Sequence, residues 1–254
     1  MTQAADQVAG AIAPEDRVSA SLALAALTLA KRFAAGATMW CVAPEWRSHG
    51  RHVAVEFVHP VIVGKRSLPT MNVEPPAAVA KLRLLARPGD VLLVVSTAED
   101  ALATDLLRRS EAWGLTRVWL GAGRAPGPSA AEHILWSDTA DPREAAMSGE
   151  IVLLYHLMWE LTHVVFEHPG LLDEEKMCTD DVCITCSDEG RIAEVRAVLD
   201  ECTATGSIAG VNEEIEISLV QPVNLGDLLL VHAGVALARI DPLDPSDSTG
   251  HVTL

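Results

Sequence analysis

Three of the five cysteines of this 254-residue chain lie within nine positions, at Cys178, Cys183 and Cys186. A cysteine thiolate is a soft metal ligand, and two cysteines three residues apart can place both sulfurs on one ion or close a disulfide. Further along the chain, His232 can stabilise a nearby thiolate or fix its proton. We therefore expect Cys183, Cys186 and His232 to form a site for a metal or a metal-containing cofactor.

A second set of potential ligands lies in the N-terminal two thirds of the chain. His52 and Glu56 are four residues apart, so a helix would place them on one face. His156, Glu160 and His163 follow at spacings i, i+4 and i+7, which also share one helical face. Histidine and carboxylate ligands suit zinc. These five residues indicate a site for a divalent ion, zinc first, a group of partly buried polar side chains at a subunit contact, or the remnant of a former site.

Composition limits the classes of protein to which this chain can belong. Hydrophobic residues make up 49% of the sequence and charged residues 21%, which is enough apolar material for a packed core. The 19 Lys and Arg residues against 35 Asp and Glu residues give a net charge of −16, which repels nucleic acid and anionic membrane surfaces. No basic segment precedes an apolar run at the N-terminus, and the longest apolar run, 22–30, is too short to span a bilayer. We expect a cytoplasmic protein with neither nucleic acid nor membrane as a partner.

The number of cysteines indicates the same compartment. Five is an odd number, and clustering of three is more typical of a thiol or metal site in a reducing compartment than of a disulfide framework. Cys41 falls in a short apolar run, so we expect it in the core. Cys178 and Cys202 are expected to take no part in the site.

Residues 1–172 show strands alternating with helices, the pattern of a parallel α/β sandwich. The Ala- and Leu-rich segment 17–35 lacks internal Gly and Pro and predicts a helix that ends at Gly36. In the clearest strand–helix unit, the apolar run 91–95 precedes a helix at about 98–113. The other expected elements are strands at 37–42, 68–73, 118–121 and 134–136, a helix at 51–58 and one long helix at 142–168.

Two segments of this region carry a family resemblance. Residues 89–97 read GDVLLVVST and precede a helix, and residues 113–121 read WGLTRVWLG. Together they resemble the sugar isomerase (SIS) domain, in particular the sedoheptulose-7-phosphate isomerases. His52, Glu56, His156 and Glu160 stand where that branch places metal-binding or catalytic side chains. The resemblance therefore implies the SIS fold and a metal-dependent sugar-phosphate isomerase as its activity.

Two loops depart from the pattern of that family. Active members carry Gly-Asn-Gly-Gly-Ser after the first strand, where residues 43–47 read APEWR. They also carry Ser-Thr-Ser-Gly-Asn-Ser in the phosphate loop, where residues 96–100 read STAED. Glu99 and Asp100 place negative charge at a helix N-terminus that would otherwise attract phosphate. We therefore expect a degenerate domain that is not an active isomerase.

Beyond an acidic linker, 173–182, the hydrophobic pattern changes to a period of two. Strands are expected at 191–199, 202–208, 214–220 and 228–232, separated by Gly and Asn turn signals. Short strands at regular spacing predict a small antiparallel, OB-like β-barrel of five strands over 183–242. Residues 243–254 are expected to form a flexible tail.

The barrel segment carries a second resemblance. Cys183-Ile-Thr-Cys186 is followed by GRIAEV at 190–195 and by GDLLLVHAGVA at 226–236. These residues resemble the HypC/HupF family of nickel–iron hydrogenase maturation chaperones, whose cysteine holds an Fe(CN)2CO unit and contacts partner proteins. The resemblance implies that Cys183 or Cys186 is this cysteine and that His232 is the histidine of the family.

Three functions are compatible with these features. The first is a chaperone that binds the Fe(CN)2CO unit and delivers it to a hydrogenase large-subunit precursor, with a HypD-type maturation protein as a further partner and the SIS-like domain used for docking or for a homo-oligomer. The second is a metal-dependent sugar-phosphate isomerase with an appended metal- or redox-binding barrel. The third is a dithiol redox module, which the β-rich setting disfavours because such motifs usually open a helix. A zinc knuckle lacking its second cysteine pair, or unreactive thiols, would explain Cys183 and Cys186 without any of these functions.

Overall fold

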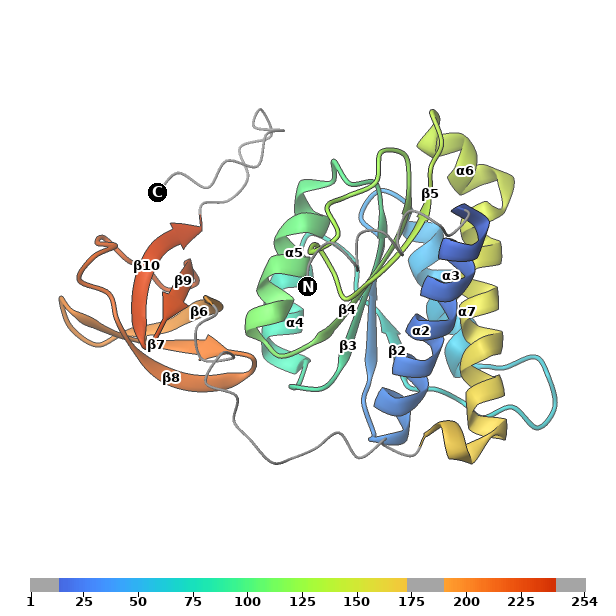
Figure 1. The fold of residues 1–254 in the computed structure, drawn as a ribbon, viewed down its shortest axis with the longest axis horizontal. Coiled ribbons are helices and arrows are strands. Elements are labelled where there is room, and N and C mark those ends of the chain that lie inside the picture. The colour runs from blue at the N-terminus through green and yellow to red at the C-terminus, as the bar shows by residue number, and fades with distance from the viewer. Residues whose placement is uncertain (1–13, 173–189, 241–254) are drawn as a thin grey trace, which may run out of the picture.

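The computed structural model describes residues 14–172 and 190–240, which form two parts that pack side by side (Figure 1). The first part is a five-stranded sheet with helices on both faces, and the second is a closed five-stranded barrel. The predicted fold class, a parallel α/β sandwich followed by a small β-barrel, is confirmed. The linker at 173–182 and the tail at 243–254 stay predictions, because they lie outside the described residues.

The central sheet has the strand order β2-β1-β3-β4-β5, with all neighbouring strands parallel. Its middle strand, β3, is buried along its whole length. A parallel sheet covered on both faces needs strands that are apolar on both sides, which explains the unbroken run Val-Leu-Leu-Val-Val. The five strands are β1 (Met39–Val42), β2 (Thr70–Asn72), β3 (Val91–Ser96), β4 (Thr116–Ala122) and β5 (His133–Ser137).

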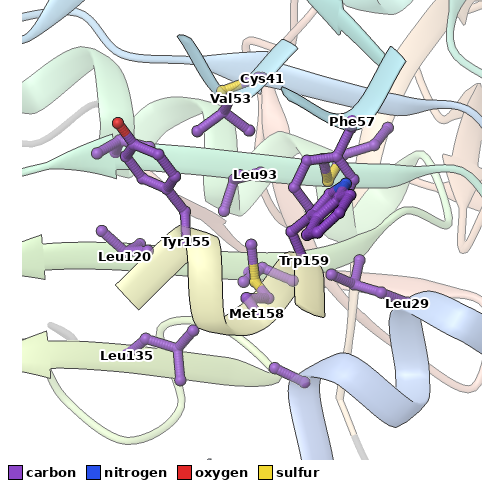
Figure 2. Close-up of a cluster of buried hydrophobic side chains, with 14 of the residues drawn as sticks. Leu29, Cys41, Val53, Phe57, Leu93, Leu120, Leu135, Tyr155, Met158 and Trp159 are labelled. Carbon is purple, nitrogen blue, oxygen red and sulfur yellow. The ribbon is translucent and has the colours of Figure 1, made fainter. Parts of the chain in front are cut away.

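Helices cover both faces of the sheet and give two hydrophobic cores. On one face lie α2 (Pro14–Ala34), α3 (Arg47–Val58), α6 (Pro142–Ser148) and α7 (Glu150–Glu167), and on the other α4 (Ala78–Leu85) and α5 (Ala101–Ala112) (Figure 1). In the first core, Tyr155, Met158 and Trp159 of α7 pack with Leu93 and Leu120 of the sheet (Figure 2). A 3-10 turn, η1 (Pro169–Leu171), follows α7. None of the helices in the described parts of the chain combines the length and the apolar character needed to cross a membrane.

The expected single helix at 142–168 is wrong, because two helices occupy this stretch. Gly149 has a φ of 94°, a left-handed conformation that ends α6 and precedes α7. Asp141 begins α6 by accepting hydrogen bonds from the backbone N–H groups of Arg143 and Glu144. The helix α4 was not predicted, because eight residues after a Pro-Pro pair give too short a periodic pattern.

The barrel closes in the strand order β10-β8-β7-β6-β9. Its neighbouring strands are antiparallel except for β8 and β10, which meet in parallel where Glu216 is opposite Val235. The expected number of five strands is therefore confirmed, with one parallel pair in a barrel that was expected to be antiparallel. The strands are β6 (Arg191–Val198), β7 (Thr203–Ile208), β8 (Val211–Glu216), β9 (Leu228–His232) and β10 (Val235–Ile240).

Two Ala-Gly hairpins determine where the strands of the barrel begin and end. Ala209 and Gly210 join β7 to β8, and Ala233 and Gly234 join β9 to β10, all four with positive φ angles of 48° to 83°. Positive φ at both central residues is the type I′ turn, whose twist matches that of antiparallel strands. The expected strand at 214–220 is therefore displaced, since the turn starts β8 at Val211. The second turn produces β10, which was not predicted.

The barrel is joined to the α/β part by a buried carboxylate on β6. Glu194 has no exposed surface. Arg83 of α4 donates two hydrogen bonds to it at 2.7 and 3.2 Å, and Arg109 of α5 donates one at 2.8 Å. The indole N–H of Trp113 donates another at 2.8 Å, and Arg196 lies 3.1 Å away. Burial alone would raise the pKa of Glu194, but the hydrogen bonds from Arg83, Trp113 and Arg109 outweigh it and lower that pKa.

Close backbone packing completes this junction. The carbonyl of Ala112, at the end of α5, accepts hydrogen bonds from the backbone N–H of Gly210 at 2.8 Å and from the hydroxyl of Ser207 at 2.9 Å. A Cβ atom on Gly210 would lie 2.4 Å from Pro88, and one on Gly114 would lie 2.5 Å from the carbonyl oxygen of Ala209. The hairpin between β7 and β8 therefore fits against the end of α5 only with glycine at both positions.

We expect Glu194→Ala to lower the free energy of unfolding by about 3 kcal/mol, because it leaves Arg83 and Arg109 without their shared acceptor. Urea denaturation measures the change. The matched control is Glu213→Ala, which removes an exposed carboxylate of the same barrel that pairs with Arg191 at 3.0 Å and should cost less than about 1 kcal/mol. Equal losses in the two variants would show that the junction does not depend on Glu194.

The lowered pKa of Glu194 adds a dependence on pH to the same comparison. A carboxylate whose pKa falls on folding stabilises the protein fully above its ordinary value of 4.5, and this contribution is lost as the pH falls below that value. The difference in stability between the wild type and Glu194→Ala should therefore shrink on acidification below pH 4.5.

Candidate functional site

Two neighbouring helices bring three potential metal ligands together. His52 and Glu56 share one face of α3, and His156 projects from α7. Glu56 Oε2 lies 3.9 Å from His52 Nε2 and 3.7 Å from His156 Nε2. One ligand atom from each residue lies within 4.8 Å of the other two. The three side chains therefore surround a space into which a single cation fits.

One atom of this cluster is buried without a hydrogen-bond partner. His156 Nε2 is inaccessible to solvent and makes no hydrogen bond, although it faces Glu56 Oε2. An unsatisfied buried nitrogen is costly, and a bound cation would satisfy it. The donor set, two imidazoles and one carboxylate, is one that zinc prefers, so the residues fit a divalent ion of this type.

The other two ligands suggested by the sequence lie elsewhere. Glu160 faces Lys65, whose ammonium nitrogen is 3.6 Å from its carboxylate. His163 is 2% exposed, with Nδ1 2.9 Å from the carbonyl oxygen of Trp159 and Nε2 3.0 Å from that of Arg66. Each ring nitrogen of His163 thus lies within hydrogen-bond distance of a backbone carbonyl oxygen. The structure brings together His52, Glu56 and His156, but neither Glu160 nor His163.

Tyr155 also contacts the cluster, and the sequence did not indicate it as a residue of this site. Its hydroxyl is hydrogen-bonded to His52 Nδ1 at 2.7 Å. Burial raises the pKa of Tyr155 to about 12, with the charge of Glu56 adding to the effect, so the phenol stays protonated at neutral pH. The only signal in the sequence was its position next to His156, as the single tyrosine of the chain.

A cavity of about 470 Å³ lies at the carboxyl edge of the sheet. Residues that follow β1 and β3 line it together with residues of α6: Glu45, Trp46, Thr97, Pro142, Arg143, Ala146 and Met147. His49 connects this cavity to the cluster. Its Nε2 lies 3.0 Å from the carbonyl oxygen of Ala146, and its ring contacts the ring of Tyr155.

The hydroxyl groups at this edge of the sheet already form hydrogen bonds with other side chains of the protein. Thr97 donates a hydrogen bond to Glu45 at 3.0 Å, and the hydroxyl of Ser96 accepts one from the indole of Trp119 at 3.0 Å. Asp100 accepts a hydrogen bond from the backbone N–H of Ala103 and so caps α5. Burial raises the pKa of Asp100, and the nearby charge of Glu45 raises it further. This edge therefore carries acidic side chains where a phosphate would need free donors.

The candidate residues of the barrel fall into two groups. His232 is the last residue of β9, half-buried, and directly precedes the Ala233-Gly234 turn. Cys183 and Cys186 lie outside the described residues. Of the cysteines in the described parts, Cys41 is buried, as predicted, and Cys202 is exposed.

Comparisons with known proteins match the two parts separately. Residues 190–248 match the model of the HupF/HypC family, a match that begins after Cys183 and Cys186. For the N-terminal part, one similar solved structure is a phosphoheptose isomerase from Francisella tularensis, with 14% identity and a TM-score of 0.49 over 64% of this chain and 92% of that one. Another is phosphoheptose isomerase GmhA from Neisseria gonorrhoeae, with 18% identity and a TM-score of 0.47 over 65% and 98%. No curated protein matches the chain significantly.

We expect no micromolar binding when sedoheptulose 7-phosphate is titrated into the protein in a calorimeter, because Glu45 and Asp100 repel a phosphate at this edge. A double variant, Glu45→Ala with Asp100→Ser, should bind more tightly than the wild type. Serine keeps a cap on α5, so the comparison isolates charge from helix stability. Micromolar affinity in the wild type would contradict this expectation.

Proposed function

We propose that the chain is a hydrogenase maturation chaperone whose barrel binds an Fe(CN)2CO unit and delivers it to the large-subunit precursor of a nickel–iron hydrogenase. A HypD-type maturation protein is the further partner. The observation that carries the proposal is the closed barrel over 191–240, whose sequence matches the HupF/HypC family. The Fe(CN)2CO unit is cargo and leaves the protein on delivery.

The register of the barrel supports a joint site for His232 and the cysteines. Arg191 of β6 is opposite Val231 of β9, so Gly190, just before β6, is next to His232. Cys186 is four residues upstream of Gly190, a chain length of at most about 14 Å, and Cys183 is seven residues upstream, at most about 25 Å. Either cysteine can therefore reach the end of β9.

The chemistry of these groups suits the cargo. Thiolate sulfur is a soft ligand, appropriate for iron that carries cyanide and carbon monoxide. A histidine beside the thiolate favours its charged form or holds its proton. In this proposal the cysteine binds the iron and His232 adjusts the thiolate.

A divalent metal in the α/β part is a second element of the proposal. His52, Glu56 and His156 hold the ion, with zinc favoured by its ligand preferences, and the unpartnered Nε2 of His156 supports this assignment. With three protein ligands, zinc retains a position for water or substrate and acts there as a Lewis acid. The same site would serve the alternative function, a metal-dependent sugar-phosphate isomerase, although the Glu45–Thr97 contact speaks against phosphate binding.

The α/β part also provides a surface for a homo-oligomer. Leu153 and Leu157 are adjacent on α7 and 58% and 41% exposed, and Leu24 of the neighbouring α2 is 59% exposed. Burial of such a face between two copies removes apolar surface from water. Sedimentation velocity at micromolar concentration would show a single copy if this part of the proposal fails.

Cys183→Ala should abolish retention of the Fe(CN)2CO unit and block hydrogenase maturation, because a lost ligand removes the binding free energy that it supplied. Cys186→Ala should reduce retention of the unit less than Cys183→Ala does. His232→Ala should reduce retention to an intermediate extent. Infrared spectra of anaerobically purified variants, which report the cyanide and carbon monoxide stretches, measure retention.

The control for this series is Cys202→Ala, which removes an exposed thiol of the same barrel and should leave the infrared bands intact. If Cys186→Ala loses the bands and Cys183→Ala keeps them, Cys186 is the leading ligand. If both variants keep them, the barrel does not use these cysteines for the cargo and the proposal fails.

For the metal, His52→Ala combined with His156→Ala should release the divalent ion, since two of its three ligands are removed. Metal content is measured by mass spectrometry in a Cys183→Ala, Cys186→Ala background, so that these two thiolates do not contribute. Glu160→Gln serves as the matched control and should retain the ion. Unchanged metal content in the double histidine variant would rule out this site.

A further inference from the structure

Tyr155 precedes His156 on α7, and its ring is fully buried next to the cluster. Its hydroxyl lies 2.7 Å from His52 Nδ1. The same ring makes edge contacts with both histidines, with centroids 5.2 Å from that of His52 and 5.1 Å from that of His156. Figure 2 shows the ring extending from α7 with the hydroxyl at its far end. One phenol therefore contacts both imidazoles of the cluster.

The hydrogen bond at Nδ1 is linked to the position of the proton on His52. A neutral imidazole has one N–H group and one lone pair. If the phenol donates to Nδ1, the proton is on Nε2, which faces Glu56 Oε2 at 3.9 Å. If Nδ1 carries the proton and donates to the phenol oxygen, Nε2 offers its lone pair to the space between Glu56 and His156.

A cation between the three side chains needs the second arrangement, because it binds to the lone pair of Nε2. A phenol can both donate and accept, so the hydrogen bond to Tyr155 is kept in either tautomer. The change takes one proton off Nε2 and puts one on Nδ1, with no net gain or loss. The His52 ring thus keeps its orientation while its ligating nitrogen is freed.

We propose that Tyr155 is a positioning residue that holds the His52 ring and accepts a hydrogen bond from its Nδ1–H group in the tautomer that binds a divalent cation. The inference rests on the divalent-metal site of the proposed function and adds a residue that is not itself a ligand. Histidine ligands generally donate their second N–H group to an acceptor, and loss of the acceptor weakens metal binding by about 10–100-fold.

The test is Tyr155→Phe, which keeps the buried ring and removes only the hydroxyl. Zinc affinity of the full chain is measured by competition with a chromophoric chelator, in the Cys183→Ala, Cys186→Ala background. We expect affinity about 10–100-fold weaker than in the parent protein, and a changed visible spectrum when Co²⁺ replaces zinc. The matched control, Thr162→Val, removes another buried hydroxyl of α7 and should leave zinc affinity unchanged.

A second measurement reports the tautomer itself. Nitrogen-15 spectra of the zinc-loaded parent protein, labelled at histidine, should show the proton of His52 on Nδ1. In Tyr155→Phe this proton should exchange faster with water, because its acceptor is gone. The parent spectrum decides the question even if the variant does not fold.

The outcomes separate the inference from the site on which it rests. Equal zinc affinity in the parent and in Tyr155→Phe overturns the positioning role and leaves the metal site intact. A proton on Nε2 of His52 in the zinc-loaded parent does the same. Failure of the parent to bind zinc or Co²⁺ overturns the metal site, and the role of Tyr155 with it.

Discussion

A carboxylate without solvent contact needs compensating charge, and Glu194 obtains it from outside its own domain. Arg83 and Arg109 reach it from α4 and α5, and Trp113 adds an indole N–H. Arg196 is the one cation that β6 itself contributes. If the barrel were separated from the α/β part, Glu194 would lie at the surface of the barrel without Arg83, Arg109 and Trp113. Together with the backbone packing of the β7–β8 hairpin against the end of α5, this contact positions the barrel on the α/β part.

This contact joins the start of β6 to the α/β part. The described residues of the barrel begin at Gly190, directly before β6. The contact through Glu194 lies three residues after Arg191, where β6 begins. β6 thus has a defined place beside α5, and His232 lies next to Gly190, just before the start of β6.

The α/β part combines a cluster of potential metal ligands with an acidic edge of the sheet. His52, Glu56 and His156 lie on rigid helices, and the distances between them are suitable for an ion. The loops after β1 and β3 carry Glu45 and Asp100, which fill the edge of the sheet with carboxylates. Ligands on helix faces depend on the packing of α3 against α7, whereas phosphate binding depends on free backbone donors in loops. The two properties can therefore be separated in one fold.

Local pattern alone determined the order and type of most elements. The run Val91–Val95 predicted a buried strand, and the change from helical to twofold periodicity marked the barrel. The spacing of His52 and Glu56 placed them on one helical face for the same reason, since these periods follow from backbone geometry. Only the tertiary structure decided which distant groups meet. Tyr155 lies 103 residues from His52, and Arg83 lies 111 residues from Glu194. Such pairs depend on which helices and strands pack together, and the periodic pattern within one element does not specify its partner.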